Sequence, residues 1–423
     1  MSTPKPIHSA FFLLHFTHMN FPIYDVLIIG GGASGLICAL ECARHGKKVL
    51  LLEKEPLLGR KILVSGNGRC NLTNSRVSPE FYHADKNLIL KTLASFPYAK
   101  CRNYFEQLGV LLREEELGRI FPVTGKATAV VEALKLAATE AGAEILTGKE
   151  VVRIKKGKAF SVYLKDQTNF QAKKIVLACG SCAYPQVSGT HAGYELAKQL
   201  GHTFVTPRPT LSALQLKESA VARLSGIRAQ VRLHLTNNPS VFTEGEIIFS
   251  NTGFSGPAAL NLSGYISRDL KKGPVPVSVN FFGQVENFDA FFQQRLSLYP
   301  HRKPKDFFAG ILHESITNLL IDFVGFRKNL PMSQQLPGTI TRAVQTLQAW
   351  PFTVTSLRPW NEAMVAAGGV NLKEINYNTF ESLKCPRAFI TGELLDVDGK
   401  SGGFNLHFAW SSGFIAAQHI SEE

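Results

Sequence analysis

The spacing of apolar residues changes several times along the chain. Val26 to Ile29 form a short, fully apolar run of the kind that predicts a buried strand, and Val49 to Leu52 form a second one. Between these runs, residues 33 to 45 have the apolar spacing of a helix, which we expect to end at His45-Gly46. The order strand, helix, strand predicts a βαβ unit near the start of the chain.

From about residue 206 the pattern changes to strict alternation. Ile227 to Leu235 and Val275 to Phe281 each place an apolar residue at every second position, which predicts two-faced strands. Residues 287 to 350 predict short helices separated by prolines. From about 351 the chain returns to strand and glycine-rich helix patterns, including a strand over 387 to 391.

Glycines fill the turn between the first strand and the helix. Gly30, Gly32 and Gly35 form G-x-G-x-x-G, in which the glycines allow a tight turn, close approach of a pyrophosphate and close packing of the helix. The pyrophosphate would lie at the positive helix N-terminus. Glu53 follows the second strand, where a carboxylate can accept hydrogen bonds from a ribose 2′-OH. This unit predicts a site for FAD or NAD rather than NADP.

A second motif near the C-terminus distinguishes between these two cofactors. Residues 390 to 415 read ITGELLDVDGKSGGFNLHFAWSSGFI. In two-dinucleotide flavoproteins, a strand ending in glycine and an acid holds the ribityl chain, and Gly392 and Glu393 fill those positions. Gly403 and Asn405 begin the following helix, whose dipole would stabilise negative charge at N1 and O2 of reduced flavin. The motif therefore favours FAD.

Residues 59 to 74, GRKILVSGNGRCNLTN, follow soon after the ribose acid. They show neither a helical nor a strand period, so we expect a long ordered loop or a loop and helix over the cofactor. The cations Arg60, Lys61 and Arg69 lie beside three glycines and could meet phosphates. A plain surface loop is the alternative.

Residues 173 to 186, KKIVLACGSCAYPQ, predict a buried strand that ends near Gly180 and reaches the cofactor. Cys179 and Cys182 form C-x-x-C, which could be a redox pair or half of a metal site. We favour a structural role, because the motif begins at a strand end and no further ligands have suitable spacing. Seven scattered cysteines suggest a reducing, cytoplasmic setting.

Residues 245 to 263, GEIIFSNTGFSGPAALNLS, form a fourth motif. Asn251, Thr252 and Ser255 could line a cleft for substrate or flavin, and a structural turn is an equal alternative.

Together with AAGGVNLKE, these motifs resemble the BaiN/RdsA-type NAD(P)/FAD-dependent oxidoreductases over residues 24 to 423. The resemblance implies a FAD domain, an inserted β-barrel-like part and a helical subdomain. One branch of that family is linked to dihydrouridine in 23S rRNA and another to bile-acid dehydroxylation. The chain departs at residues 179 to 183, CGSCA, where the family usually has Thr-Gly-Gly and a serine before Tyr184.

The motifs and the resemblance define a set of expected cofactor contacts. These are Gly30, Gly32, Ala33, Ser34, Gly35, Glu53, Lys54, Arg60, Lys61, Ser65, Asn67, Gly68, Asn71, Val151, Gly180, Gly392, Glu393, Asp398, Gly403, Asn405 and Leu406. No metal site is expected.

The expected fold is α/β: a Rossmann-like FAD-binding domain of the two-dinucleotide flavoprotein type, with an inserted β-barrel-like part and a small helical subdomain. We expect a tail over residues 1–23, the first part of the FAD domain over 24–205, the insertion over 206–350 and the second part of the FAD domain over 351–423. The tail precedes the first strand, so we expect Met1 to Asn20 to be dispensable.

Charge suggests a partner. Lys and Arg outnumber Asp and Glu by 46 to 33, giving a net charge of +13, which favours a polyanion. Residues 206 to 350 contain 15 Lys and Arg against 9 Asp and Glu, so this third of the chain contributes 6 of the excess of 13. No apolar stretch has the length of a membrane span, so we expect no membrane partner.

Two functions follow from these features. The first is an RNA-modifying flavoenzyme, reduced by NADH or NADPH, that converts a uridine of 23S rRNA to dihydrouridine; the base must be unstacked to reach the flavin. The second is a small-molecule ene-reductase or dehydrogenase acting on a bile acid or another enone. A non-catalytic FAD-binding scaffold is a third alternative. No second G-x-G-x-x-G occurs, so the nicotinamide cofactor would visit only transiently.

Reduction of a C=C bond beside a carbonyl needs a hydride on one carbon and a proton on the other, so a proton donor is required. Cys70 is the first candidate, because Arg69 and Lys61 should lower the pKa of its thiol toward neutrality. A packing role for Cys70 is the alternative, and Tyr184 is the rival donor.

Overall fold

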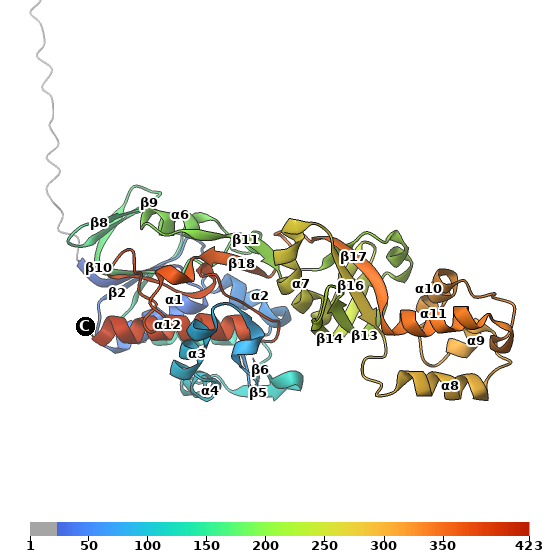
Figure 1. Cartoon of the computed structure of the whole chain (residues 1–423). Coiled ribbons are helices and arrows are strands. Elements are labelled where there is room, and N and C mark those ends of the chain that lie inside the picture. The colour runs from blue at the N-terminus through green and yellow to red at the C-terminus, as the bar shows by residue number, and fades with distance from the viewer. Residues whose placement is uncertain (1–22, 423) are drawn as a thin grey trace, which may run out of the picture.

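The computed structural model describes residues 23–422, so the expectation for Met1 to Asn20 lies outside the described residues. Most of the N-terminal part and most of the C-terminal part of the chain together form the first lobe. The middle of the chain forms an elongated second lobe (Figure 1). Each lobe has its own hydrophobic core. The expected α/β class with an inserted barrel and a helical part is confirmed.

The first lobe is built on a sheet that has seven strands within the described residues. The strands run in the order β7-β2-β1-β10-β9-β8, and β19 pairs with β10. Their bounds are β1 Ile23–Ile29, β2 Val49–Leu52, β7 Glu144–Leu146, β8 Val151–Lys156, β9 Phe160–Leu164, β10 Asn169–Leu177 and β19 Ala388–Ile390. Strands β7, β2, β1, β10 and β19 are parallel neighbours. Their near-continuous apolar sequences follow from this, because a parallel sheet is covered on both faces.

Helices from both ends of the chain cover this sheet. Helix α1 (Ala33–Arg44) packs beside α12 (Phe404–Glu422) (Figure 1). The other helices of the lobe are α2 Arg60–Gly68, α3 Lys86–Ser95, α4 Tyr98–Gln107, α5 Ala127–Glu140 and α6 Ala192–Gln199. Short strands form two further small sheets in this lobe. One sheet contains β3 Thr73–Asn74, β5 Leu112–Glu115 and β6 Arg119–Pro122, and the other pairs β4 Tyr82–His83 with β20 Asp398–Gly399. The pairing of α1 with α12 makes the cofactor lobe depend on both chain ends.

The second lobe contains a closed barrel followed by helices. The barrel order is β12-β15-β14-β13-β16-β17. The strands are β12 Leu214–Leu216, β13 Arg228–Leu235, β14 Asn238–Ser250, β15 Gly253–Ser255, β16 Val275–Asn280 and β17 Trp350–Leu357, and helix α7 (Pro257–Asp269) packs on them. Helices α8 Phe288–Leu298, α9 Pro304–Phe308, α10 Glu314–Val324 and α11 Pro337–Gln348 extend away from the first lobe (Figure 1). The alternating strands and proline-punctuated helices expected here are present.

Two antiparallel strands join the lobes. β11 (Phe204–Thr210) leads into the barrel and pairs with β18 (Val365–Val370), which leads back. The barrel strand β17 runs past residue 350 to Leu357, so the structure continues the barrel beyond the boundary expected there. The domain boundaries themselves stay a prediction.

Candidate functional site

The glycine-rich turn has the geometry that a dinucleotide needs. Gly30 has a φ of +112°, and a side chain at Gly35 would lie 1.9 Å from the Gly30 carbonyl oxygen. Gly32 is the N-cap of α1, where no side chain caps the helix and a Cβ atom would meet nothing within 4 Å. The first N–H groups of α1 therefore face open space, as an anion site requires.

Glu53 stands at the end of β2 and helps to shape the same turn. Its Oε2 accepts a hydrogen bond from the Gly31 N–H at 2.7 Å, and its Oε1 accepts one from the Glu55 N–H at 2.9 Å. A carboxylate oxygen has more than one acceptor site, so both oxygens can still accept from a ribose hydroxyl.

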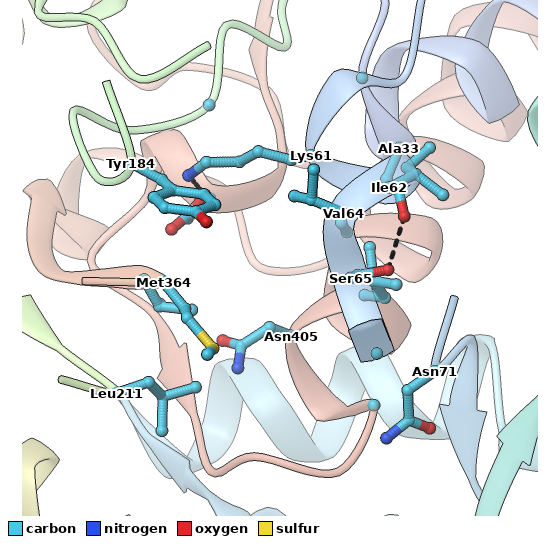
Figure 2. A pocket seen from close by; sticks show the side chains of 18 of the residues that line it. Ala33, Lys61, Ile62, Val64, Ser65, Asn71, Tyr184, Leu211, Met364 and Asn405 are labelled. Carbon is cyan, nitrogen blue, oxygen red and sulfur yellow. Dashed lines mark hydrogen bonds and ion pairs between the residues drawn. The ribbon is translucent and has the colours of Figure 1, made fainter. Parts of the chain in front are cut away.

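A cavity of about 1440 Å³ runs from this turn to the barrel. It is larger than the roughly 300–1,000 Å³ of a pocket for one drug-sized ligand, which leaves room for a substrate beside a cofactor. Most of the expected contacts line it: Gly30, Gly32, Ala33, Ser34, Glu53, Lys54, Arg60, Lys61, Ser65, Asn67, Asn71, Val151, Gly180, Tyr184, Glu393, Gly403, Asn405 and Leu406. Figure 2 shows Tyr184, Met364 and Leu211 across this cavity from Val64, Ser65 and Asn71.

Four of the expected cofactor contacts do not line the cavity. Three are glycines that shape the backbone, and one is a buried acid. Gly35 packs α1 against the turn, and Gly68 has a φ of +81° at the end of α2. Gly392 has a φ of +67°, and a side chain there would lie 2.7 Å from Ser34 Oγ. Asp398 is buried beside Arg268, with Oδ1 3.3 Å from Nη2.

Segment 59 to 74 adopts the loop-and-helix alternative. Helix α2 breaks at Ser65, because Gly66 and Asn67 have φ of +55° and +58°. The cations do not all meet the cavity. Arg60 lines it and also pairs with Glu55 at 2.5 Å, whereas Arg69 lies outside it.

The expectation for the Cys70 thiol is wrong. Cys70 is fully buried and does not line the cavity, and burial raises the pKa of its thiol to about 12. Arg69 cannot lower that pKa as expected, because its guanidinium pairs with Glu115 at 3.0 Å and lies over the Phe121 ring at 4.1 Å. Cys70 therefore has the environment of a packing residue.

The two ends of the chain meet at one ion pair in the cavity wall. Lys61 Nζ lies 2.7 Å from Glu393 Oε2 and 3.4 Å from Ser181 Oγ. Glu393 Oε1 accepts a hydrogen bond from the Ala366 N–H at 3.2 Å. The acid expected to hold a ribityl chain is thus fixed by Lys61 and Ala366, which come from two other segments of the chain.

The start of α12 closes the floor of the cavity. A side chain at Gly403 would lie 2.5 Å from the Thr73 carbonyl oxygen. The Asn405 amide is used within the loop, since it accepts from the Gly399 N–H at 2.8 Å and donates to the Gly399 carbonyl at 2.8 Å. Asn405 therefore shapes the approach to the helix N-terminus, which is the part left to meet a flavin.

Asn71 provides the clearest sign of a missing ligand group. Its Oδ1 atom is buried, has no hydrogen-bond partner among the described residues, and belongs to a side chain that lines the cavity. A buried polar atom without a partner is costly, so a donor on a bound group is expected there. The N–H group of a flavin ring is such a donor, whereas the uncapped N–H groups at the start of α1 suit the acceptor oxygens of a diphosphate. FAD would be held by the glycine turn, Glu53, Asn71, Lys61, Glu393 and the α12 N-terminus.

The C-x-x-C thiols are in buried surroundings. All seven cysteines are free. Burial raises the pKa of Cys179 to about 12 and also raises the pKa of Cys182. Cys179 lines the cavity, and its Sγ atom lies 3.4 Å from the Ile29 carbonyl oxygen. Protonated thiols at neutral pH agree with a structural role, which stays a prediction.

The substrate side was only partly visible in the sequence. Tyr184 lies where expected, but Leu211 and Met364 also face the cavity, and no local pattern marked either one. In the fourth motif, Gly245, Pro257, Leu260 and Asn261 line the cavity, whereas Asn251, Thr252 and Ser255 do not.

Residues 23–422 contain neither a cluster of metal ligands nor a membrane-spanning helix. No group of three or more His, Cys, Asp or Glu side chains could hold a metal ion. In the same residues, no helix has the length and apolarity to cross a bilayer.

Comparison with known proteins gives a consistent result. The family model described as the HI0933-like protein Rossmann domain matches residues 24–419. A 3-dehydro-bile acid delta(4,6)-reductase of Clostridium scindens is 31% identical over 403 residues, covering 93% of this chain and 98% of the relative. A ribosomal RNA dihydrouridine synthase of Haemophilus influenzae is 30% identical over 404 residues, covering 94% of this chain and 98% of the relative.

A solved structure shares the fold. The 3-ketosteroid-delta4-(5alpha)-dehydrogenase of Rhodococcus jostii RHA1 aligns with a TM-score of 0.51 at 15% identity, covering 95% of this chain and 98% of that one. The match of the family model over nearly the whole chain establishes that the chain belongs to the HI0933-like Rossmann-domain family of flavin-dependent oxidoreductases.

Proposed function

We propose that this flavoenzyme reduces the C5=C6 double bond of a uridine in 23S rRNA, with NADH or NADPH as the reductant. The reaction adds a hydride at C6 and a proton at C5. FAD, when bound, supplies the hydride. The protein must therefore hold the base against the cofactor and deliver the proton.

The observation that carries this proposal is the conformation of Tyr184. Its φ is +61°, a left-handed backbone that non-glycine residues adopt rarely and that is often retained for function. The Tyr184 N–H donates to the Trp360 carbonyl at 3.0 Å, and the Tyr184 carbonyl accepts from the N–H groups of Val187, Ser188 and Gly189. These bonds hold the phenol at the cavity, where an O–H can donate a proton at C5.

The cationic character of the chain supports a nucleic-acid substrate over a small neutral one. The excess of 13 cations favours binding of a phosphate backbone. A relative named as a ribosomal RNA dihydrouridine synthase is similar over 94% of the chain, which agrees with the proposal.

A small enone substrate is the second candidate. Leu211, Met364 and Val64 give the cavity apolar walls that suit a steroid ring system. A relative named as a bile-acid reductase is similar over 93% of the chain.

The test uses the FAD-loaded enzyme with NADH or NADPH and two acceptors: transcribed 23S rRNA and a 3-oxo-4,6-diene bile acid. We expect dihydrouridine in the digested rRNA by mass spectrometry. Turnover of the bile acid with no dihydrouridine would replace the proposed function with the second candidate.

Two variants then test the proton donor. Tyr184→Phe should leave reduction of the bound flavin by NAD(P)H intact and slow its reoxidation by the acceptor by roughly 10²-fold or more, the usual size of a general-acid contribution. Cys70→Ala should keep both half-reactions. The reverse result would restore Cys70 as the donor.

A further inference from the structure

An exposed leucine stands at the edge of the cavity in an unusual conformation. Leu117 is 68% exposed, lines the cavity, and has a φ of +61°. It lies in the turn between β5 and β6. A bulky apolar residue is costly both in a left-handed backbone and in water, so its position calls for an explanation beyond local folding.

Asn74 holds the turn at Leu117, which is the tip of the β5–β6 connection, against the start of α12. Its Nδ2 donates to the Leu117 carbonyl at 3.1 Å and to the Gly402 carbonyl at 2.9 Å. Next to the tip, the Ser75 N–H donates to the Gly118 carbonyl at 2.8 Å, and a side chain at Gly118 would lie 2.7 Å from Asn74 Oδ1. The buried asparagine therefore ties the backbone of Leu117 to the loop that precedes α12.

Three cations line the cavity close to the tip. Arg76 follows Asn74 by two residues, is exposed, and has neither an ion pair nor a side-chain hydrogen bond within residues 23–422. Arg119 follows the tip and donates from Nε to the Glu116 carbonyl at 3.0 Å. Lys400 lies over the Phe81 ring, with Nζ 5.5 Å from its centroid. Glu116 is an acid that lines the cavity next to Leu117, so the three cations outnumber it at this tip.

We infer that this rim, formed by Leu117, Arg76, Arg119 and Lys400, binds the RNA strand on either side of the reacting base. Leu117 takes the place of a stacking neighbour once the base leaves the stack, as apolar wedges do in nucleic acids. The cations contact the adjacent phosphates. The inference rests on the proposed function and adds the surface that would make the enzyme select a base within a folded RNA over a free nucleotide.

The variants are chosen to keep the fold. Leu117→Asn removes the apolar tip with a residue that adopts left-handed backbone readily. Arg76→Gln removes the unpaired cation. The matched controls are Leu111→Asn, an exposed leucine of the same lobe outside the cavity, and Lys91→Gln, an exposed cation on α3 outside it.

The FAD-loaded enzymes are compared on transcribed 23S rRNA and on uridine 5′-monophosphate. We expect Leu117→Asn to lower kcat/KM on rRNA by roughly 10-fold or more while its rate on the mononucleotide, its FAD content and its flavin reduction by NAD(P)H stay at wild-type values. Arg76→Gln should reduce the salt slope of rRNA binding by about 0.7, the value for one phosphate contact on a single strand. The controls should match wild type.

The outcomes separate this inference from the proposed function. If the wild type forms dihydrouridine and both rim variants keep wild-type kcat/KM and salt slope, the rim inference is wrong and the proposed function stands. If the wild type forms none in any rRNA, the proposed function fails and the rim inference fails with it.

Discussion

Lys61 and Glu393 lie 332 positions apart in the chain, yet Nζ and Oε2 are 2.7 Å from each other in the cavity wall. Their side chains are 25% and 18% exposed, so water screens this ion pair less than a surface pair. The pair joins α2, which belongs to the N-terminal part of the first lobe, to the turn after β19, which belongs to the C-terminal part of the same lobe. The two segments expected to hold the middle of the cofactor are thus linked directly.

A double-mutant cycle should detect this link. We expect Lys61→Met and Glu393→Gln each to lower stability and FAD retention, and the double variant to lose less than the sum, with a coupling of about 0.5–3 kcal/mol for contacting residues. Urea unfolding of the FAD-bound proteins measures it. Lys165 and Glu150, which also pair at 2.9 Å but are 73% and 38% exposed, should show no measurable coupling in the same cycle.

Glu53→Ala should weaken FAD binding by roughly 10-fold or more, because it removes charge-assisted hydrogen bonds both to the expected ribose and to the Gly31 N–H that shapes the turn. Titration of the apoprotein with FAD, followed by flavin fluorescence, gives the Kd. Asp166→Ala, an exposed acid paired with Lys149 at 2.7 Å, is the control and should bind FAD normally. Retention of FMN but not FAD by the wild type would contradict the assignment of an adenosine site.

The sequence predicted the cofactor lobe well because its determinants are local. The positive φ of Gly30 and the close contact of Gly35 with the Gly30 carbonyl are set within one turn, and Glu53 follows directly from the end of a strand. The prediction for Cys70 failed because its determinants are distant. The partner that neutralises Arg69 is Glu115, 46 positions away, and the burial that raises the thiol pKa depends on the packed core.

The substrate side was hard to predict for a similar reason. Leu211 and Met364 come from the segments that enter and leave the barrel, and they meet only because β11 pairs with β18. Asn405 lines the cavity, but its amide is already hydrogen-bonded to Gly399, which no periodicity indicates. Tertiary contacts, rather than local sequence pattern, therefore decide which side chains face the cavity and which polar groups remain free to bind a ligand.

The C-x-x-C motif should be dispensable for electron transfer. Replacing Cys179 and Cys182 together by Ser should leave FAD content and flavin reduction by NAD(P)H near wild type, because burial keeps both thiols protonated at pH 7. Stopped-flow absorbance of the flavin measures the second quantity. Normal FAD binding with blocked electron transfer to the acceptor would show that the pair is a redox centre.

Asp398 should make stability depend on pH in an unusual direction. Burial raises the pKa of its carboxyl to about 7, against the favourable charge of Arg268, whereas an unfolded Asp has a pKa of about 3.9. Between these values the folded state binds more protons than the unfolded state, so this group's contribution to stability falls as pH rises from about 4 to 7. Above pH 7 the contribution is constant.

Asp398→Asn removes that titration. The stability of the variant relative to wild type should therefore increase from pH 4.5 to 7.5, by an amount on the order of a few kcal/mol, and then level off. Thermal unfolding across this range measures the difference. His83, whose pKa burial lowers to about 4, gives the opposite slope but is present in both proteins. Asp322→Asn is the control, because Lys328 and Arg223 lower the pKa of that acid instead of raising it. A flat difference between the Asp398 variant and wild type would mean that the buried carboxyl is already ionised at pH 4.5, held so by Arg268.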